Sequence, residues 1–190
     1  ERQIRTIRNV LQGILLEFRP TLGTNSLRTL FYETASIVNS RPLAVEGLND
    51  PHEPLAITPN HLLTQKTNVI LAPPGQFSSS DLHTKKQWRQ VQFLANQFWD
   101  RWRKEYLSQL QKRQKWTTTK QNLQVGDVVL LEDSNHVRGE WRMARVTGTH
   151  PGKDGLVRHV TLRLGDRSNE RPRVCVQRPV SKVKLLITNF

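Results

Sequence analysis

Cysteine is nearly absent from this 190-residue chain, which carries Cys175 alone. One cysteine excludes an internal disulfide and any zinc site that needs two or more thiolate ligands. We therefore expect Cys175 to be a small buried residue in a strand. Long apolar runs and a signal segment are also absent, so the sequence predicts a soluble, intracellular protein without a membrane span. The first residue is Glu1 rather than Met, which indicates an excised piece.

Local signatures of catalysis are missing as well. The chain has no Ser-His-Asp or Cys-His signature and no glycine-rich phosphate loop. Its six histidines are scattered, so each is interpreted as a loop residue rather than a metal ligand. The residues by themselves therefore predict no complete active site and no cofactor held by this chain.

What the chain has in excess is positive charge, with a formal net charge of +13. Residues 1–80 carry seven basic and six acidic side chains, residues 81–120 carry ten and three, and residues 121–190 carry twelve and seven. Such an excess in the second half is typical of proteins whose cations displace counterions from nucleic-acid phosphates. Plain solubility and packing within RNA are alternatives. An anionic membrane is disfavoured, because no basic helix shows a clean apolar insertion face.

Hydrophobic periodicity predicts three helices. Apolar residues recur at spacings of three and four over residues 2–18, and Pro20 terminates that helix. A second helix is expected from an N-cap at Asn25 or Ser26 to about Ser40. Its predicted buried face comprises Leu27, Leu30, Phe31, Ala35 and Val38. A long helix capped by Asp81 is expected over residues 81–115.

The segment between the second and third helices, residues 41–80, is rich in proline and predicts loops. Within it, residues 58–61 predict a turn with helix-capping chemistry. Leu62 and Leu63, together with residues 69–71, are expected to pack on the helices. Residues 75–80 are interpreted as a linker.

The long helix carries an aromatic stripe. Trp88, Trp99 and Trp102 lie on it and are interpreted as core, or as a dimer seam, rather than as a platform for stacked bases. The polar stripe of the same helix comprises Lys85, Arg89, Gln92, Asn96 and Arg103.

Residues 122–190 predict a small β-barrel. The expected strands are residues 125–131, 141–147, 156–164, 174–176 and 183–187. The sequence PGKDG at residues 151–155 is a strong turn signal between the second and third of them. The predicted class is α+β. The predicted divisions are helices at residues 1–75, a linker and long basic helix at 76–121, and the barrel at 122–190.

Arginine dominates over lysine in the barrel, which favours bidentate phosphate contact, although a solvated surface is the alternative. The arginines are Arg138, Arg142, Arg145, Arg158, Arg163, Arg167, Arg171, Arg173 and Arg178. The candidates for nucleic-acid contact are Arg5, Arg8, Lys112, Arg113, Lys115, Lys120, Arg142, Arg145, Lys153, Arg158, Arg178 and Lys182. A reader of methyl-lysine is excluded, because only Trp141 and Phe190 are aromatic after residue 121.

Several segments resemble retrotransposon integrases. Residues 1–5 (ERQIR), 39–43 (NSRPL) and 55–63 (LAITPNHLL) are similar to the end of the catalytic core. Residues 125–131 (VGDVVLL), 139–146 (GEWRMARV), 150–158 (HPGKDGLVR) and 178–183 (RPVSKV) resemble the C-terminal domain of Pao/BEL-type integrases. The order and number of these motifs, over nearly the whole chain, carry the resemblance.

The resemblance implies a nuclear DNA-binding part of an integrase. It implies the helical end of a ribonuclease-H-like core, a connecting helix and a Src-homology-3-like barrel. Glu1 matches the third acidic residue of a catalytic triad that holds Mg²⁺ in the parent, whose two Asp partners would lie upstream. This chain alone is therefore expected to position DNA and to multimerise without catalysing strand transfer. A non-enzymatic RNA-binding or domesticated structural protein, and an enzyme completed by partner chains, are the alternatives.

Overall fold

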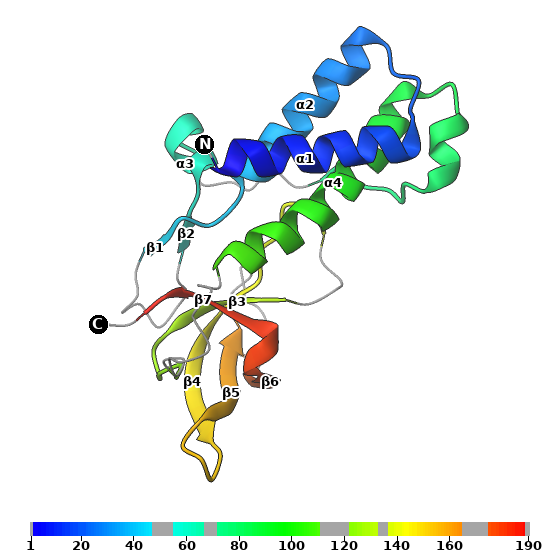
Figure 1. Cartoon of the computed structure of the whole chain (residues 1–190). Helices are drawn as coiled ribbons and strands as arrows, with labels where there is room; N and C mark the ends of the chain where they lie inside the picture. Colours follow the sequence, from blue (N-terminus) through cyan, green and yellow to red (C-terminus); the bar gives the residue numbers. More distant parts are fainter. Residues whose placement is uncertain are drawn as a thin grey trace.

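The computed structural model describes residues 2–46, 55–66, 72–110, 122–132, 137–164 and 175–188, and it confirms an α+β chain (Figure 1). A helical layer contains α1 (Arg2–Phe18), α2 (Thr24–Asn39) and α4 (Gln87–Leu110). A five-stranded antiparallel sheet lies beside it. Among the described helices, none is both long and apolar enough to cross a membrane.

Helices α1 and α4 run antiparallel to each other. Arg101 of α4 forms a 2.6 Å ion pair with Glu17 near the end of α1. At the other end, the Gln109 side chain donates a 3.1 Å hydrogen bond to the Thr6 hydroxyl. Between these contacts Ile14 is buried in a core with residues of α2 and α4. The helix predicted over residues 2–18 is thus confirmed, apart from residue 1, which lies outside the described part.

Helix α2 buries only part of the face that the sequence predicts: Leu30 and Val38 are buried as expected. Its buried residues are Ser26, Leu30, Thr34, Ile37 and Val38. Phe31 is 49% exposed and Ala35 is exposed, so their predicted burial is wrong. Burial of Thr34 is tolerated because its hydroxyl donates to the Leu30 carbonyl at 2.8 Å. The N-cap is Gly23 rather than Asn25 or Ser26.

The segment predicted as loops contains three short elements. Strands β1 (Ala44–Glu46) and β2 (Leu55–Ile57) pair antiparallel, and α3 (Pro59–Thr64) follows them. The capping prediction is confirmed, because the Thr58 side chain accepts from the His61 N–H. Leu62 and Leu63 are 67% and 72% exposed, so their predicted packing is wrong. Residues 69–71 lie outside the described residues.

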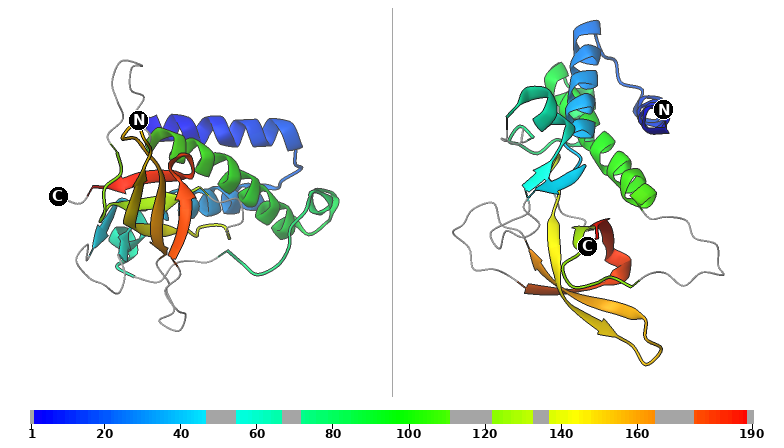
Figure 2. Two further views of the ribbon diagram at one scale, coloured as in Figure 1. Left: turned by 90° about the horizontal axis from the view of Figure 1, so that it is seen from below. Right: turned by 90° about the vertical axis from the view of Figure 1, so that its left-hand side faces the viewer.

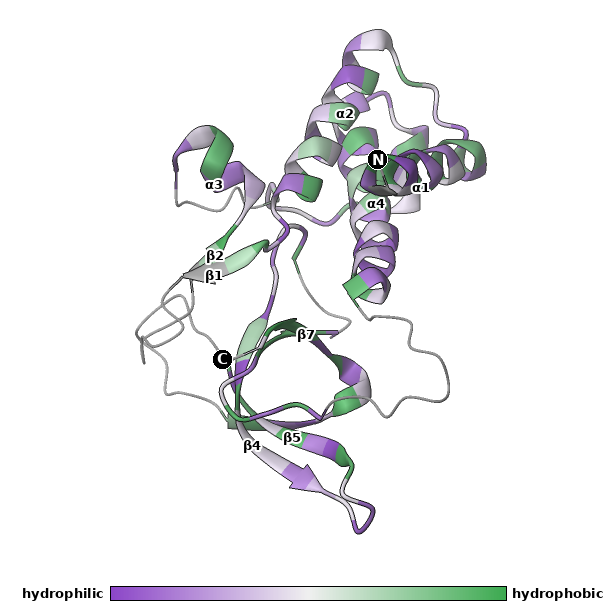
Figure 3. Ribbon diagram, turned by 60° about the vertical axis from the view of Figure 1, so that its left-hand side comes forward, coloured by the Kyte–Doolittle hydropathy of each residue, from purple (hydrophilic) through white to green (hydrophobic). Residues whose placement is uncertain are grey.

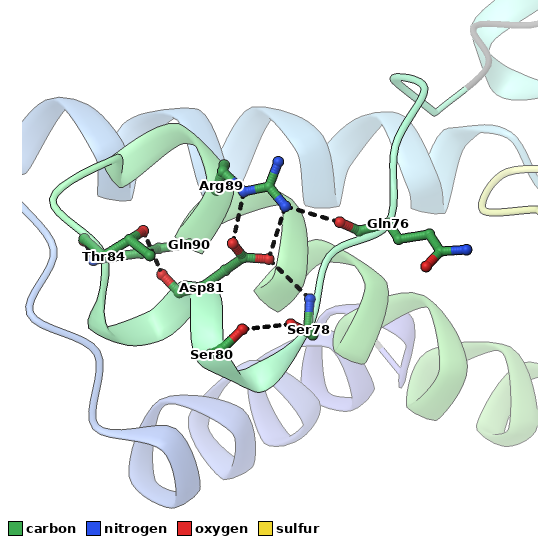
Figure 4. Close-up of polar contacts among 7 residues, drawn as sticks. All are labelled: Gln76, Ser78, Ser80, Asp81, Thr84, Arg89 and Gln90. Atoms are coloured by element: carbon green, nitrogen blue, oxygen red, sulfur yellow. Dashed lines mark hydrogen bonds and ion pairs between the residues drawn. The ribbon is translucent and has the colours of Figure 1, made fainter.

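The long helix begins later than predicted. Asp81 lies in a separate 3-10 turn, η1 (Ser79–His83), whose capping box uses the side chains of Ser78 and Asp81. The Asp81 carboxylate accepts from the Ser78 N–H at 2.9 Å and from Arg89 Nε at 2.6 Å (Figure 4). The Arg89 hydrogen bond, followed by that from Ser78, lowers the pKa of Asp81. The turn ends in extended backbone at Thr84, so α4 begins at Gln87; residues 111–115 lie outside the described part.

The sheet contains β3 (Val128–Leu131), β4 (Met143–Pro151), β5 (Val157–Leu164), β6 (Cys175–Pro179) and β7 (Val183–Ile187), with a short 3-10 turn, η2 (Val180–Lys182), before β7. Their order is β6-β5-β4-β3-β7, and the sheet curls around an apolar interior (Figure 3). All five predicted strands are confirmed, with shifts of a few residues at their ends. Cys175 is exposed in the edge strand β6, so its predicted burial is wrong.

The β3–β4 loop docks the sheet onto the helices through Trp141. Its ring packs edge-on against Trp99, Trp102 and Tyr106 of α4, with centroid separations of 5.0 to 5.9 Å. Trp99 and Trp102 are therefore core residues, as predicted. Trp88 is 51% exposed and contacts Phe77 instead, so the core prediction for it is wrong.

Arg138, from the same loop, is inserted between α2 and α4. Only 5% of its side chain is exposed, and it pairs with Glu33 at 3.3 Å. It also donates to the side chains of Gln92 and Asn96. Burial lowers the pKa of Arg138, and the charge of Glu33 opposes that effect. The phosphate contact considered for Arg138 is therefore wrong, and Gln92, assigned to a polar stripe, is buried.

Truncation of Trp141 tests this docking. We expect Trp141→Ala to lower the free energy of unfolding by about 3 kcal/mol, because a large aromatic is removed from a packed interface. Trp88→Ala is the matched control and should cost less than about 1 kcal/mol, since that side chain is half exposed. Urea unfolding of both variants provides the measurement, and equal losses would contradict the assigned interface.

Replacement of Asp81 tests the turn before α4. An ionised group whose pKa is lowered by folding stabilises the protein above its unfolded pKa, about 4 for Asp. That stability is lost as the pH falls through the lower folded value. Asp81→Asn should therefore unfold at lower urea than the wild type at pH 7. The difference should shrink below about pH 4, and a difference that is the same at both pH values would refute the assignment.

Candidate nucleic-acid interface

The β4–β5 hairpin carries an excess of positive charge. Residues 143–164 include four basic side chains, Arg145, Lys153, Arg158 and Arg163, and a single acidic one, Asp154. Arg145 and Arg163 are directly opposite each other on the two strands. Opposed residues of an antiparallel pair share a face of the sheet, and the interleaved Ala144, Val146 and Leu162 are buried on the other face. Arg145 and Arg163 therefore lie side by side on the outer face, each half-buried.

The tip of the hairpin carries the exposed cations. Lys153 is exposed in the turn, and Arg158 forms a 2.6 Å ion pair with Asp154. The turn is closed by hydrogen bonds from Gly152 N to Leu156 O at 2.9 Å and from Gly155 N to Gly152 O at 3.0 Å. Gly155 has a φ of +74°, a conformation that favours glycine. The turn signal read from residues 151–155 is thus confirmed, and it presents Lys153 to solvent.

Asn122 braces the tip from outside the hairpin. Its side-chain oxygen accepts from the Val157 N–H at 3.1 Å, and its nitrogen donates to the Gly155 carbonyl at 2.9 Å. One amide side chain thereby holds two backbone groups of the turn, so the position of Lys153 and Arg158 depends on a residue more than thirty positions earlier. Sequence reasoning missed Asn122, because no local pattern marks it.

Polar side chains follow the arginines along the outer face. His150 and His159 are directly opposite each other, and the His150 ring nitrogen lies 2.9 Å from the Thr161 hydroxyl. Both histidines are exposed and lie in strands, so their interpretation as loop residues is wrong. The face therefore offers hydrogen-bonding groups beside its cations.

The remaining residues predicted to contact nucleic acid do not lie together with the hairpin cations. Arg178 is paired in register with buried Val160, which places it on the face opposite to Arg145 and Arg163. Arg142 precedes β4 and Lys182 lies in η2, and both are exposed. Arg5 and Arg8 are exposed on α1, at the end that contacts the end of α4. The candidates outside the described residues are Glu1, Lys112, Arg113, Lys115 and Lys120.

The described residues do not fit the Mg²⁺ that the integrase resemblance implies for the parent. No group of three or more His, Cys, Asp or Glu side chains gathers anywhere in the described ranges. Two such ions require several carboxylate ligands.

Removal of the Asn122 side chain tests the brace. Asn122→Ala leaves the Val157 N–H without its acceptor, so amide exchange at Val157 should become roughly fivefold faster. Thr147→Val is the matched control. It removes another exposed hydrogen bond of the hairpin, 3.2 Å to the Thr161 carbonyl, and should leave Val157 unchanged. Residue-resolved exchange by NMR distinguishes them, and unaltered exchange at Val157 in Asn122→Ala would rule out the brace.

Comparison with known proteins identifies the part of the chain that is shared with others. No curated protein and no solved structure matches the chain. Residues 86–186 match a family described as a family of unknown function, DUF5641. The matched range begins just before α4 and ends within β7, so it takes in the long helix, the β3–β4 loop and the sheet together. This match covers more than half of the 190 residues, and the chain therefore belongs to the DUF5641 family.

Proposed function

We propose that this chain binds nucleic acid, and that the β4–β5 hairpin is the principal contact among its described residues. The observation that carries the proposal is the charge of the hairpin, residues 143–164, which contains four cations and a single carboxylate. That carboxylate, Asp154, is already paired with Arg158. The remaining positive charge is not neutralised by acidic residues of the hairpin itself. Such a surface attracts phosphates and releases their condensed counterions.

We also propose that the chain is part of a Pao/BEL-type integrase in which it positions DNA in the nucleus and contributes to multimerisation. The order of motifs along the sequence supports this. The strand order supports it too, because four strands form a meander and the fifth returns after a 3-10 turn to pair with the first. This arrangement is expected of a Src-homology-3-like small barrel. Strand transfer with Mg²⁺ would belong to the parent protein.

RNA is the alternative ligand. Phosphate contacts alone do not distinguish the two nucleic acids, since both backbones carry the same charged group. A non-enzymatic RNA-binding role would use the same hairpin cations. Competition between duplex DNA and structured RNA separates the two roles.

A salt titration tests the proposal. Binding of a short DNA duplex should weaken steeply as KCl is raised. The double variant Lys153→Gln/Arg158→Gln should reduce the slope of log K against log salt by about 2, because each cation held among the phosphates neutralises about one of them and contributes roughly 0.9, even where its hydrogen bonds go to a base.

The matched control is Lys85→Gln/Lys86→Gln. It removes the same charge from two exposed residues in the segment that joins η1 to α4, outside the β4–β5 hairpin. We expect its slope and affinity to stay close to those of the wild type. The proposal is wrong if wild-type affinity barely changes with salt, or if the control variant loses as much as the hairpin variant.

A further inference from the structure

The end of the β4–β5 hairpin is a two-stranded ribbon. Strand β4 pairs with β3 only over Met143–Arg145, and β5 pairs with β6 only over His159–Arg163. In the described structure no third strand pairs with the hairpin between His150 and Arg158. The ribbon extends away from the helices and beyond the rest of the sheet (Figure 2). Its tip and its outer face at His150 and His159 are therefore exposed, whereas Val157 packs against the interior of the sheet.

The dimensions of this ribbon are compatible with the major groove of duplex DNA. The two strands of the ribbon lie about 5 Å apart, and the turn between the end of β4 at Pro151 and the start of β5 at Val157 projects beyond them. The major groove of B-form DNA is about 12 Å wide and 8.5 Å deep, and it admits a two-stranded ribbon. We infer that the tip of the β4–β5 hairpin enters the major groove of B-form duplex DNA. This inference rests on the proposed nucleic-acid binding.

The chemistry of the tip suits base edges. Lys153 offers donors to the two acceptors that guanine presents in the major groove. The Arg158–Asp154 pair offers a guanidinium for guanine and a carboxylate that accepts from the cytosine amino group. The ion pair is exposed, so both groups are available to a ligand.

Cationic and polar side chains farther from the tip can contact the phosphates on both sides of the groove. Arg145 and Arg163 lie side by side on the outer face, beyond His150 and His159 when counted from the tip. With the tip in the groove, these arginines and histidines face the phosphates that border it. Contacts with phosphates fix the register of the protein on the duplex, whereas the tip reads the bases.

The tip is held in place before any ligand arrives. Asn122 binds Gly155 and Val157, and two backbone hydrogen bonds close the turn between Gly152 and Leu156. A loop ordered in advance loses less conformational entropy on binding. The turn therefore enters the groove in the conformation that it already has in the free protein.

Two other ligand classes fit the hairpin less well. Non-specific binding of single strands relies on aromatic side chains on which bases stack. Between residues 122 and 188 the only Phe, Tyr or Trp is Trp141, and it packs against α4. Duplex RNA has a deep, narrow major groove that side chains do not read. The geometry thus favours DNA over RNA.

The test uses the whole chain and four probes of one base sequence. These are a DNA duplex, the same duplex with glucosylated hydroxymethyl groups on cytosine C5, a duplex RNA, and the DNA duplex saturated with the minor-groove ligand netropsin. The C5 groups fill the major groove, so affinity should fall by about tenfold or more, and RNA should bind comparably weakly. Netropsin should leave the affinity unchanged. Lys153→Gln should remove most of the difference between plain and C5-substituted DNA, and Lys85→Gln should retain it.

Each result decides one claim. Equal binding to plain DNA, C5-substituted DNA and RNA, with a steep salt dependence, overturns groove entry and leaves the proposed nucleic-acid binding intact. Displacement by netropsin overturns it in favour of the minor groove, and preference for RNA overturns it in favour of an A-form ligand. Failure to bind any of the probes at low salt overturns the proposed function itself.

Discussion

The guanidinium of Arg138 is buried between α2 and α4, and the placement of the sheet on the helices depends on it. An arginine in this environment is tolerated only with charge and hydrogen-bond partners, which Glu33, Gln92 and Asn96 supply. Three residues later, the Trp141 ring packs against Trp99, Trp102 and Tyr106 of α4. Its ring nitrogen lies 3.3 Å from the Ser40 hydroxyl. The buried ion pair and the aromatic contact thus join the same loop to the helices. The matched family range spans both partners of this contact, which is consistent with helix and sheet forming one unit.

This docking determines which part of the sheet is left free of the helices. The β3–β4 loop lies against the helices at the start of β4, so β4 and β5 extend from the docked end toward the free one (Figure 1). The inner face of the hairpin consists of buried apolar residues, and its cations lie on the outer face and at the tip. The cations at the tip of the hairpin therefore lie on the part of the sheet farthest from the helices (Figure 1). This placement supports the proposal that the hairpin contacts nucleic acid.

Sequence reasoning predicts the elements whose signal is local. Residues 2–18 and 183–187, and the turn at 151–155, are confirmed because periodicity and turn residues act over a few positions. It fails where a polar side chain is satisfied from far away. Gln and Arg are usually exposed, yet Gln92 and Arg138 are both buried. The Arg138 side chain donates a hydrogen bond to the Gln92 side chain, which lies 46 positions earlier in the sequence. The candidate cations were found by composition, but the strand register decides that Arg178 lies on the opposite face from Arg145, and only the fold brings Asn122 to the tip.

The central claim is that the tip of the β4–β5 hairpin is the part of the described chain that contacts nucleic acid. Hydrogen–deuterium exchange of the whole chain, with and without a saturating DNA duplex, tests it without any substitution. The account predicts new protection confined mainly to residues 150–161, and little change in α2 or in the buried part of α4. Protection concentrated on α1 or α2, with exchange in the hairpin unchanged under conditions of full binding, would contradict it.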